Sequence, residues 1–377
     1  MFPPLPLLLL LCATLCSLAS ALPPPPPPRV AIIGGGNFAL AIAAVAGYKG
    51  VPVTMLVRSP AVAAHINEHS RHPKYMSDLS LPPSVSATAD PTLPFAAATL
   101  IIHAVPVQYT RSTLLPLLPH IPPSTPLLSA SKGIECSSLM FMAELLPSLL
   151  GERPYAYLSG PSFAREMLLR LPTAVVVASA SPALADDVSA LLSSPSFRCY
   201  TSRDVVGVEV GGSAKNVIAL AAGMCEGLGL GTNAMAGLVT RGCAEMRRLG
   251  IYLGGQQSTL SGLSGVGDTF GTCFGPLSRN RQFGVRIGRG ETVAEILSDS
   301  TEVAEGVETC GALVELIKKT SGGFRLDLKY PIIFGTDQIL KGNMGAREGL
   351  AKLMEMPLRM ESYEILKDGG LVARDRK

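Results

Sequence analysis

The stretch RVAIIGGGNFALAIAAVAG, residues 29–47, decides the fold of this 377-residue chain. It begins with a short apolar run, continues through three glycines and ends in small residues at helical spacing. A strand that turns on glycines into a helix is typical of dinucleotide-binding domains: Gly34 would make the tight turn, and Gly36 would let a pyrophosphate approach the backbone. Ala39 stands where a third glycine is usual, and a small side chain is sufficient there. By itself the motif leaves open a glycine-rich turn that binds nothing.

The next apolar run, 53–57, ends directly before Arg58. Domains selective for NAD often place a carboxylate at this point, where it binds the ribose 2′-hydroxyl. An arginine there can hold a 2′-phosphate or stack on adenine, so we expect NADPH to be accepted alongside NADH. The alternative is a solvated surface arginine.

Two halves of the chain differ in pattern. Before Asp204, near-continuous apolar runs alternate with crossover segments, which indicates a parallel sheet covered on both faces, at 30–33, 53–57, 100–105, 126–131, 156–160 and 174–179. After Asp204, apolar residues recur at helical spacing. We therefore predict an α/β chain: a Rossmann-type, doubly wound NAD(P)-binding domain over 29–204, then an all-α substrate and catalytic domain over 205–377.

Residues 1–28 form a separate leader. An apolar core of signal-peptide length is followed by the small residues 19–21, a plausible cleavage site, and by a polyproline spacer. The apolar run is too short for a membrane span, and we expect no stable span elsewhere. We predict a cleaved signal that leads into the secretory route, including the two-step route into some plastids. Because no positive charge precedes the apolar core, an inert start and a cytosolic location are the alternative.

Composition excludes several functions. The formal net charge is +3 with scattered Lys and Arg, and there is no Trp, so a nucleic-acid surface is not expected. The cysteines show no C-x-x-C pair, which argues against a structural metal. His65 and His69 have the i,i+4 spacing of metal ligands on a helix, but the polar segment that follows favours an ordinary surface helix.

The second half of the chain, where we expect the group that transfers a proton, contains no histidine. Another side chain must therefore do this work. Lys215 lies in the small, apolar stretch VEVGGSAKNVIALAAG, and burial there would disfavour its charged form and suit it to acid/base work. A lysine that snorkels from an amphipathic helix is an equal alternative. Asp268 is a single carboxylate in the glycine-rich GLSGVGDTFGTC, and the arginines of 278–281 (SRNR) could clamp a phosphate or carboxylate.

Taken in order, these segments resemble the bacterial and plastid-type NAD(P)-dependent glycerol-3-phosphate dehydrogenases. The resemblance extends from about Arg29 to Glu361, and its most specific motifs are SASKGIE (129–135), GPSFA (160–164), AKN (214–216), GVGD (265–268) and SRNR (278–281). It implies oxidation of sn-glycerol 3-phosphate at C2 to dihydroxyacetone phosphate, or the reverse reduction, as a supply for glycerolipid and phospholipid synthesis. It also implies a small-molecule substrate and a homodimer.

The same resemblance assigns roles to residues. Lys215 would be the acid/base, Lys132 would add positive charge near the carbonyl, and Asp268 would position Lys215 and the substrate. Substrate contacts are implied for Lys132, Gly160, Ser162, Lys215, Asp268, Ser278, Arg279 and Asn280. Contacts with NAD or NADP are implied for Gly34, Gly36, Asn37, Phe38, Arg58, Lys132, Ala164, Arg279, Val303 and Glu305. Hydride transfer requires no metal.

The chain departs from the family pattern at three positions. Phe38 and Ala39 replace a usual Trp and Gly beside the cofactor, and Met356 replaces a usual Arg near the C-terminus. These changes bear on cofactor affinity and on a surface contact, not on the reaction. Another two-domain enzyme, of the β-hydroxyacid or 6-phosphogluconate dehydrogenase type, would lack the combined GPSFA and SRNR motifs. A non-catalytic redox sensor would have lost one of the residues Lys132, Lys215, Asp268 and Arg279, all of which are present.

Overall fold

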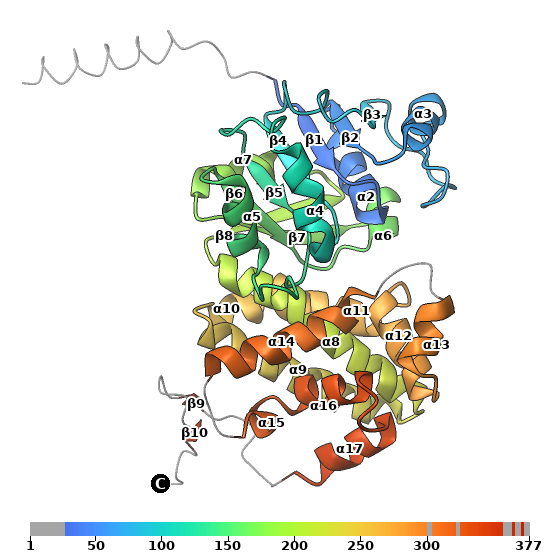
Figure 1. The fold of residues 1–377 in the computed structure, drawn as a ribbon, viewed down its shortest axis with the longest axis vertical. Helices are drawn as coiled ribbons and strands as arrows, with labels where there is room; N and C mark the ends of the chain where they lie inside the picture. The colour runs from blue at the N-terminus through green and yellow to red at the C-terminus, as the bar shows by residue number, and fades with distance from the viewer. Residues whose placement is uncertain (1–26, 300–303, 322–324, 357–363, 366–370, 373–377) are drawn as a thin grey trace, which may run out of the picture.

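The structure is a computed structural model that describes residues 27–299, 304–321, 325–356, 364–365 and 371–372. An eight-stranded sheet with its covering helices forms the first half, and helices form the second half below it (Figure 1). Nearly all of the expected leader, and the expected cofactor residue Val303, lie outside the described residues.

The sheet has the strand order β3-β2-β1-β4-β5-β6-β7-β8. Its first six strands follow the order of a dinucleotide-binding sheet. All six predicted apolar runs overlap a strand, and the sequence analysis missed two further strands, β3 and β8. The strands are β1 (Val30–Ile33), β2 (Val53–Leu56), β3 (Val85–Thr88), β4 (Leu100–His103), β5 (Leu127–Ser129), β6 (Tyr155–Ser159), β7 (Thr173–Ala178) and β8 (Phe197–Ser202).

The expectation of a wholly parallel sheet is wrong at one pair of strands. β6 and β7 are antiparallel, with Tyr157 opposite Ala178, whereas the other neighbouring pairs of this sheet are parallel. The helix in the connection, α6 (Ala164–Leu168), has five residues and is therefore about 7.5 Å long. It is too short to return the chain along β6, so β7 starts at the edge where β6 ends.

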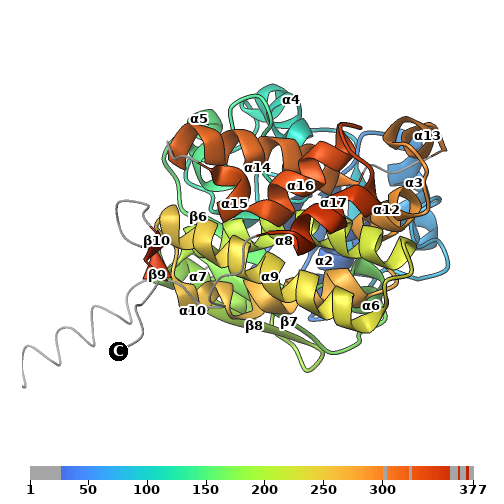
Figure 2. The same ribbon diagram turned by 90° about the horizontal axis from the view of Figure 1, so that it is seen from below.

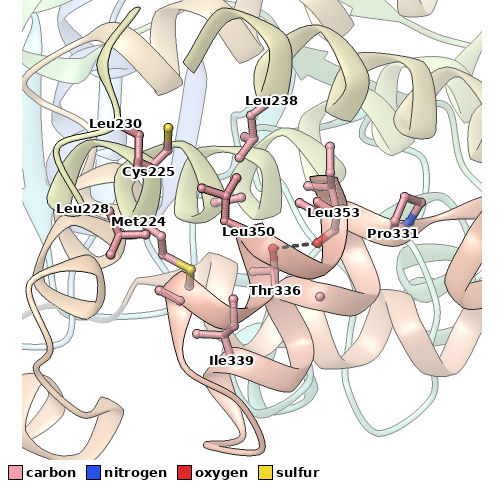
Figure 3. Close-up of a pocket in the computed structure, with 15 residues that line it drawn as sticks. Met224, Cys225, Leu228, Leu230, Leu238, Pro331, Thr336, Ile339, Leu350 and Leu353 are labelled. Atoms are coloured by element: carbon pink, nitrogen blue, oxygen red, sulfur yellow. Dashed lines mark hydrogen bonds between the residues drawn. The ribbon is translucent and has the colours of Figure 1, made fainter. Parts of the chain in front are cut away.

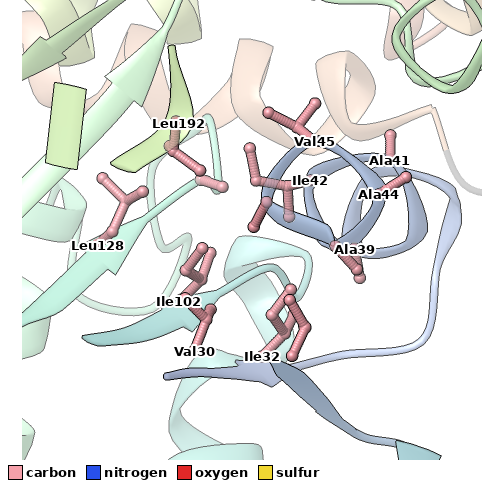
Figure 4. Packing of buried hydrophobic residues seen from close by; sticks show 14 of the residues in the cluster. Val30, Ile32, Ala39, Ala41, Ile42, Ala44, Val45, Ile102, Leu128 and Leu192 are labelled. Atoms are coloured by element: carbon pink, nitrogen blue, oxygen red, sulfur yellow. The ribbon is translucent and has the colours of Figure 1, made fainter. Parts of the chain in front are cut away.

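Helices cover both faces of the sheet. On one face α2 (Asn37–Gly47) lies against β1 and β4, where Ile42 packs near Val30 and Ile102 (Figure 4). The other face is packed by Ile33, Ile101 and the helix α5 (Met142–Leu150). The remaining helices of this half are α3 (Pro60–His69), η1 (Val107–Tyr109), α4 (Thr110–Leu114), η2 (Leu115–Leu117) and α7 (Pro182–Leu192).

The second half is helical, as predicted, except for a two-stranded antiparallel pair near the C-terminus, β9 (Glu364–Ile365) and β10 (Leu371–Val372). The division of the chain into domains at 204 and 205 stays a prediction. The helices are α8 (Val205–Gly227), α9 (Gly231–Tyr252), α10 (Gln257–Leu260), the π-helical turn η3 (Leu263–Gly267), α11 (Asp268–Phe274), α12 (Arg279–Gly288), α13 (Val293–Asp299), α14 (Glu305–Ser321), α15 (Leu326–Lys329), α16 (Pro331–Leu340) and α17 (Ala346–Met354).

Helix α8 is the centre of this half, and α9, α12, α14 and α16 pack around it (Figure 2). Its length and apolar composition would let it cross a membrane, but 83% of its most apolar window is buried within the structure. It is therefore a core helix. Where α8 crosses α12, the backbones touch: a Cβ on Gly223 would lie 2.0 Å from the Arg281 carbonyl oxygen, and one on Gly284 would lie 2.1 Å from that of Leu220.

This crossing tolerates no side chain. We expect Gly284→Ala to force α8 and α12 apart and to lower the free energy of unfolding by about 1–3 kcal/mol, the usual cost of overpacking. Urea unfolding followed by circular dichroism measures the change. Gly237→Ala is the matched control, because Gly237 lies exposed inside α9 with nothing within 4 Å of a Cβ. It should leave the stability unchanged or raise it by up to about 1 kcal/mol. Equal stability of the two variants would contradict the inferred close contact.

Candidate active site

The glycine-rich loop lies at the carboxyl end of β1. Gly34 adopts a φ of +132°, and a Cβ there would lie 2.5 Å from the Ala104 carbonyl oxygen, so only glycine fits. Gly36 is the N-cap of α2, and a Cβ on it would meet nothing within 4 Å. Open space beside the N-terminal end of a helix suits a phosphate, because the first N–H groups of a helix have no partner within it and the helix dipole favours negative charge there. The loop therefore fits the pyrophosphate of a dinucleotide.

The side chains around this loop differ in exposure. Ala39 is fully buried, which agrees with the expectation that a small side chain is sufficient there. Phe38 and Ala164 are partly buried and pack against the apolar cluster on this face of the sheet. Arg58 is exposed and has no hydrogen-bond or ion-pair partner among the residues that the structure describes.

Three charged side chains from distant parts of the chain meet beyond the sheet. The Asp268 carboxylate accepts a hydrogen bond from Lys132 Nζ at Oδ2 (2.8 Å) and one from Lys215 Nζ at Oδ1 (2.7 Å). All three are largely buried, with side-chain exposures of 3% for Asp268, 14% for Lys132 and 11% for Lys215. The two lysines proposed for chemistry thus share one carboxylate, and Lys215 does not snorkel to solvent.

Each member of this triad is delivered by a different element. Lys132 follows β5, Lys215 lies in the middle of α8, and Asp268 is the first residue of α11 after the π-helical turn η3. Lys132 Nζ also donates to the Gly160 carbonyl oxygen at 2.9 Å and contacts Ser162 Oγ at 3.4 Å. The turn at Gly160, with a φ of +131°, brings this carbonyl to the lysine from the end of β6.

Two residues of the site were missed by the sequence analysis. Thr272 Oγ1 donates to the Asp268 carbonyl oxygen at 2.6 Å and accepts from Lys215 Nζ at 3.0 Å. Its i,i+4 spacing from Asp268 on a helix was a usable signal. Asn216, beside Lys215 in α8, accepts at Oδ1 from Asn280 Nδ2 at 2.9 Å. The adjacency of Asn216 to the candidate lysine was the signal in that case.

The SRNR segment begins α12 beside these groups. Ser278 is the N-cap of this helix, and its hydroxyl accepts from the Arg281 N–H at 3.2 Å. Asn280 also accepts at Oδ1 from the Gly306 N–H at 3.0 Å, so its amide joins α8, α12 and α14. Arg279 is exposed. The expected arginine fork is incomplete, because Arg281 pairs with Glu226 on α8 at 2.6 Å.

The charges of the site shift one another's pKa values. Burial pushes the pKa of Asp268 upward, but Lys132 and Lys215 outweigh burial, so the carboxyl titrates below its usual range. Burial lowers the pKa of Lys132 to about 8, although Asp268 opposes the shift. Desolvation raises the pKa of Glu305, at the start of α14, against the attraction of Arg279 and Lys215.

Two other places in the structure were candidates for a site, the histidine pair on α3 and an apolar pocket in the helical half. His65 and His69 lie on α3 with ring centroids 4.4 Å apart, and the described residues contain no group of three or more His, Cys, Asp or Glu side chains that could hold a metal. An apolar pocket between α8, α16 and α17 is lined by residues such as Met224, Ile339 and Leu350 (Figure 3). Its lining has no charged side chain, so it cannot perform the chemistry of the triad.

Comparison with known proteins gives the same family along the chain. Residues 29–185 match the family model described as the N-terminus of NAD-dependent glycerol-3-phosphate dehydrogenase, and residues 204–351 match the model of its C-terminus. The chloroplastic glycerol-3-phosphate dehydrogenase [NAD(+)] of Oryza sativa subsp. japonica is 43% identical over 86% of this chain and 74% of its own length.

Bacterial relatives are as similar. The glycerol-3-phosphate dehydrogenase [NAD(P)+] of Desulfovibrio desulfuricans is 45% identical over 88% of this chain and 98% of its own length. Among solved structures, the glycerol-3-phosphate dehydrogenase of Coxiella burnetii superposes with a TM-score of 0.82 at 32% identity, over 88% of this chain and all of its own.

The shared carboxylate supports a prediction on stability. Asp268→Asn would remove the carboxylate that two buried ammonium groups share, so we expect the free energy of unfolding to fall by about 3 kcal/mol at pH 7. Because the folded-state pKa of Asp268 is depressed, its contribution is present above the ordinary value of 3.8 and is lost as the pH falls below it. The difference between the two proteins in urea unfolding should therefore shrink below pH 3.8.

Glu315→Gln is the control, since Glu315 makes an exposed ion pair with Lys318 on α14. That change should leave stability unaltered at every pH. A loss in Asp268→Asn no larger than in the control would show that the triad carries no net stabilisation.

Proposed function

Because this chain belongs to the NAD-dependent glycerol-3-phosphate dehydrogenase family, we propose that Lys215 is the acid/base of its reaction. The protein is an NAD(P)-dependent oxidoreductase that interconverts sn-glycerol 3-phosphate and dihydroxyacetone phosphate. The observation that carries the proposal is the placement of Lys215 Nζ, which is buried and held at 2.7 Å from Asp268 and 3.0 Å from Thr272.

These contacts suit proton transfer at C2. When bound, the nicotinamide supplies or accepts the hydride at that carbon. Lys215 gives the proton to the oxygen on C2 during reduction and takes it back during oxidation. Asp268 and Thr272 hold the Nζ atom in one position, so little reorganisation is needed at the moment of transfer. A buried, pre-oriented donor of this kind contributes most where charge develops.

Lys132 supports the same step as a fixed positive charge. Its Nζ lies within reach of the Gly160 carbonyl and Ser162, the residues expected beside the substrate. We assign the phosphate end of the substrate to Ser278, Arg279 and Asn280 at the start of α12, a ten-residue helix whose N-terminal end favours anions.

The nucleotide is assigned to the edge of the sheet above the triad. The Gly34–Gly36 turn and Asn37, the first residue of α2, would hold the pyrophosphate. Phe38, Ala164 and Glu305 would line the rest of the site together with Lys132 and Arg279, and Val303 keeps the role expected from the sequence. Arg58 would face the 2′-phosphate of NADP, because its exposed guanidinium has no partner among the described residues.

The family match favours this reaction over the two alternatives raised by the sequence. A β-hydroxyacid or 6-phosphogluconate dehydrogenase would not match both models of this family. Binding a dinucleotide to sense redox state does not require two buried lysines that share one carboxylate. The interpretation as an enzyme is supported by a geometry suited to proton transfer, in which Lys132 and Lys215 both donate to Asp268.

For location, we propose that residues 1–28 direct the protein to a plastid, with secretory entry as the first step. The support is the leader itself and the plant relative named as chloroplastic, while the names of the bacterial relatives state no compartment. A fluorescent fusion of the first 60 residues should enter plastids of algal cells, and a cytosolic signal would contradict the proposal. The homodimer also stays a prediction, which sedimentation of the purified protein would test.

The function is tested by the enzyme itself. Purified residues 29–377 should reduce dihydroxyacetone phosphate with NADH and with NADPH, and Lys215→Ala should lower kcat by about 10²–10⁴-fold, the range for loss of a general acid. Lys352→Ala is the control, because Lys352 makes an exposed pair with Glu348 on α17. Near-normal turnover in Lys215→Ala would disprove the acid/base assignment. Activity with NADH alone would contradict the role given to Arg58.

A further inference from the structure

The segment that carries Lys132, residues 131–136, is held from one side by residues 103–111. The residues that hold it belong to the end of β4, to η1 and to α4. Segment 131–136 begins two residues after β5 and has no strand or helix to support it apart from a single bridge between Ile134 and Phe141. The position of the Lys132 backbone therefore depends on contacts to the segment, many of which come from side chains, while its Nζ is held by Gly160 and Asp268.

Gln108 makes the central contacts. Its Nε2 donates to the Ile134 carbonyl oxygen at 2.8 Å, and its Oε1 accepts from the Cys136 N–H at 3.0 Å. One side-chain amide therefore binds the backbone of the segment at two points, as a neighbouring strand would. Both points lie within four residues of Lys132.

Contacts on either side complete the attachment. Ser131, next to Lys132, donates to the Val105 carbonyl oxygen at 2.6 Å and lies 3.0 Å from His103 Nδ1. Arg111 makes a bidentate pair with Glu135, with Nε and Nη2 at 3.1 and 2.9 Å from the two carboxylate oxygens. The pairing is a strong, directional one.

Further elements lie close to the segment at Gly133 and Cys136. A Cβ on Gly133, whose φ is +149°, would lie 3.2 Å from Val107 Cγ2 and 3.5 Å from Thr309 Oγ1. Cys136 Sγ lies 3.6 Å from the Glu308 carbonyl oxygen. The segment therefore lies between η1 and α14 at Gly133.

We propose that Gln108 is a positioning residue for Lys132: its amide fixes the backbone that aims the Lys132 ammonium at Asp268. The proposal rests on the proposed function, because it gives Lys132 a part in the reaction. Gln108 touches none of the triad and acts only through the segment.

A double-mutant cycle tests the route of this effect. Gln108→Met keeps the length of the side chain and removes both hydrogen bonds. It should lower kcat for reduction of dihydroxyacetone phosphate by about 10- to 100-fold, the cost of misplacing a catalytic group by about 1 Å. In the Lys132→Met background, the same change should lower kcat by less than about twofold, because the lysine through which Gln108 acts is no longer present.

Two further variants keep the result interpretable. Gln338→Met is the matched control: the Gln338 amide on α16 also donates and accepts, to Asp337 and from Asn343, far along the chain from the site. It should leave kcat unchanged. Gln108→Glu keeps the acceptor for Cys136 N–H but places a carboxylate oxygen against the Ile134 carbonyl oxygen, so its kcat should fall at least as far as that of Gln108→Met. It takes the place of Gln108→Met in the cycle if that variant does not fold.

The outcomes separate this inference from the proposed function. An equal loss of kcat in both Lys132 backgrounds, or no loss in the wild-type background, would overturn the positioning role while leaving the function intact. Full activity of Lys132→Met would instead overturn the part given to Lys132 in the proposed function. A cycle in which Lys132→Met is impaired and Gln108→Met adds little to it supports the proposal.

Discussion

The arrangement of the site depends on the Asp268 carboxylate between the Lys132 and Lys215 ammonium groups. A buried carboxylate is costly unless it is paired, and a single lysine would satisfy only one of its oxygens. Here each oxygen has its own lysine, at 2.8 and 2.7 Å. Since Lys132 comes from the edge of the sheet and both other groups come from the helical half, this pairing also joins the two halves of the chain. The proposed chemistry and the contact between the two halves therefore rely on the same three charges.

Glycines in helix α8 allow its neighbours to approach closely enough for these three charged groups to meet. Glycine costs about 1 kcal/mol relative to alanine inside a helix, yet α8 has several on the faces it packs. Gly223 lets α12 approach to backbone contact, and a Cβ on Gly211 would lie 2.6 Å from the Ser264 carbonyl oxygen in the π-helical turn. With its neighbours this close, α8 brings Lys215 to Asp268 and Asn216 to Asn280. The glycines lower the intrinsic stability of α8, and in return they allow the close packing that places these side chains.

The edge of the sheet positions the other residues of the site, by the common end of its strands. Parallel strands end along one edge, which gathers Gly34, Lys132 and Gly160 from β1, β5 and β6. Strands control where a loop starts but not where its side chains point. Around Lys132, the Gln108 amide and the Arg111 guanidinium, both from the crossover between β4 and β5, hold segment 131–136.

Local patterns in the sequence determined much of this protein. The glycine turn before α2, six apolar strands and the helical pattern after Asp204 all reflect interactions between residues close along the chain. The motifs around Lys215 and Asp268 were specific enough to identify the family. Two strands were hidden, because β3 reads VSAT and β8 reads FRCYTS, with too few apolar residues to be recognised. Only the tertiary structure decided the antiparallel direction of β7, the contacts of Thr272 with Lys215 and of Asn216 with Asn280, and the pairing of Arg281 with Glu226. These depend on which surfaces meet: Lys132 and Asp268 are 136 residues apart, and no local pattern encodes a contact across that distance.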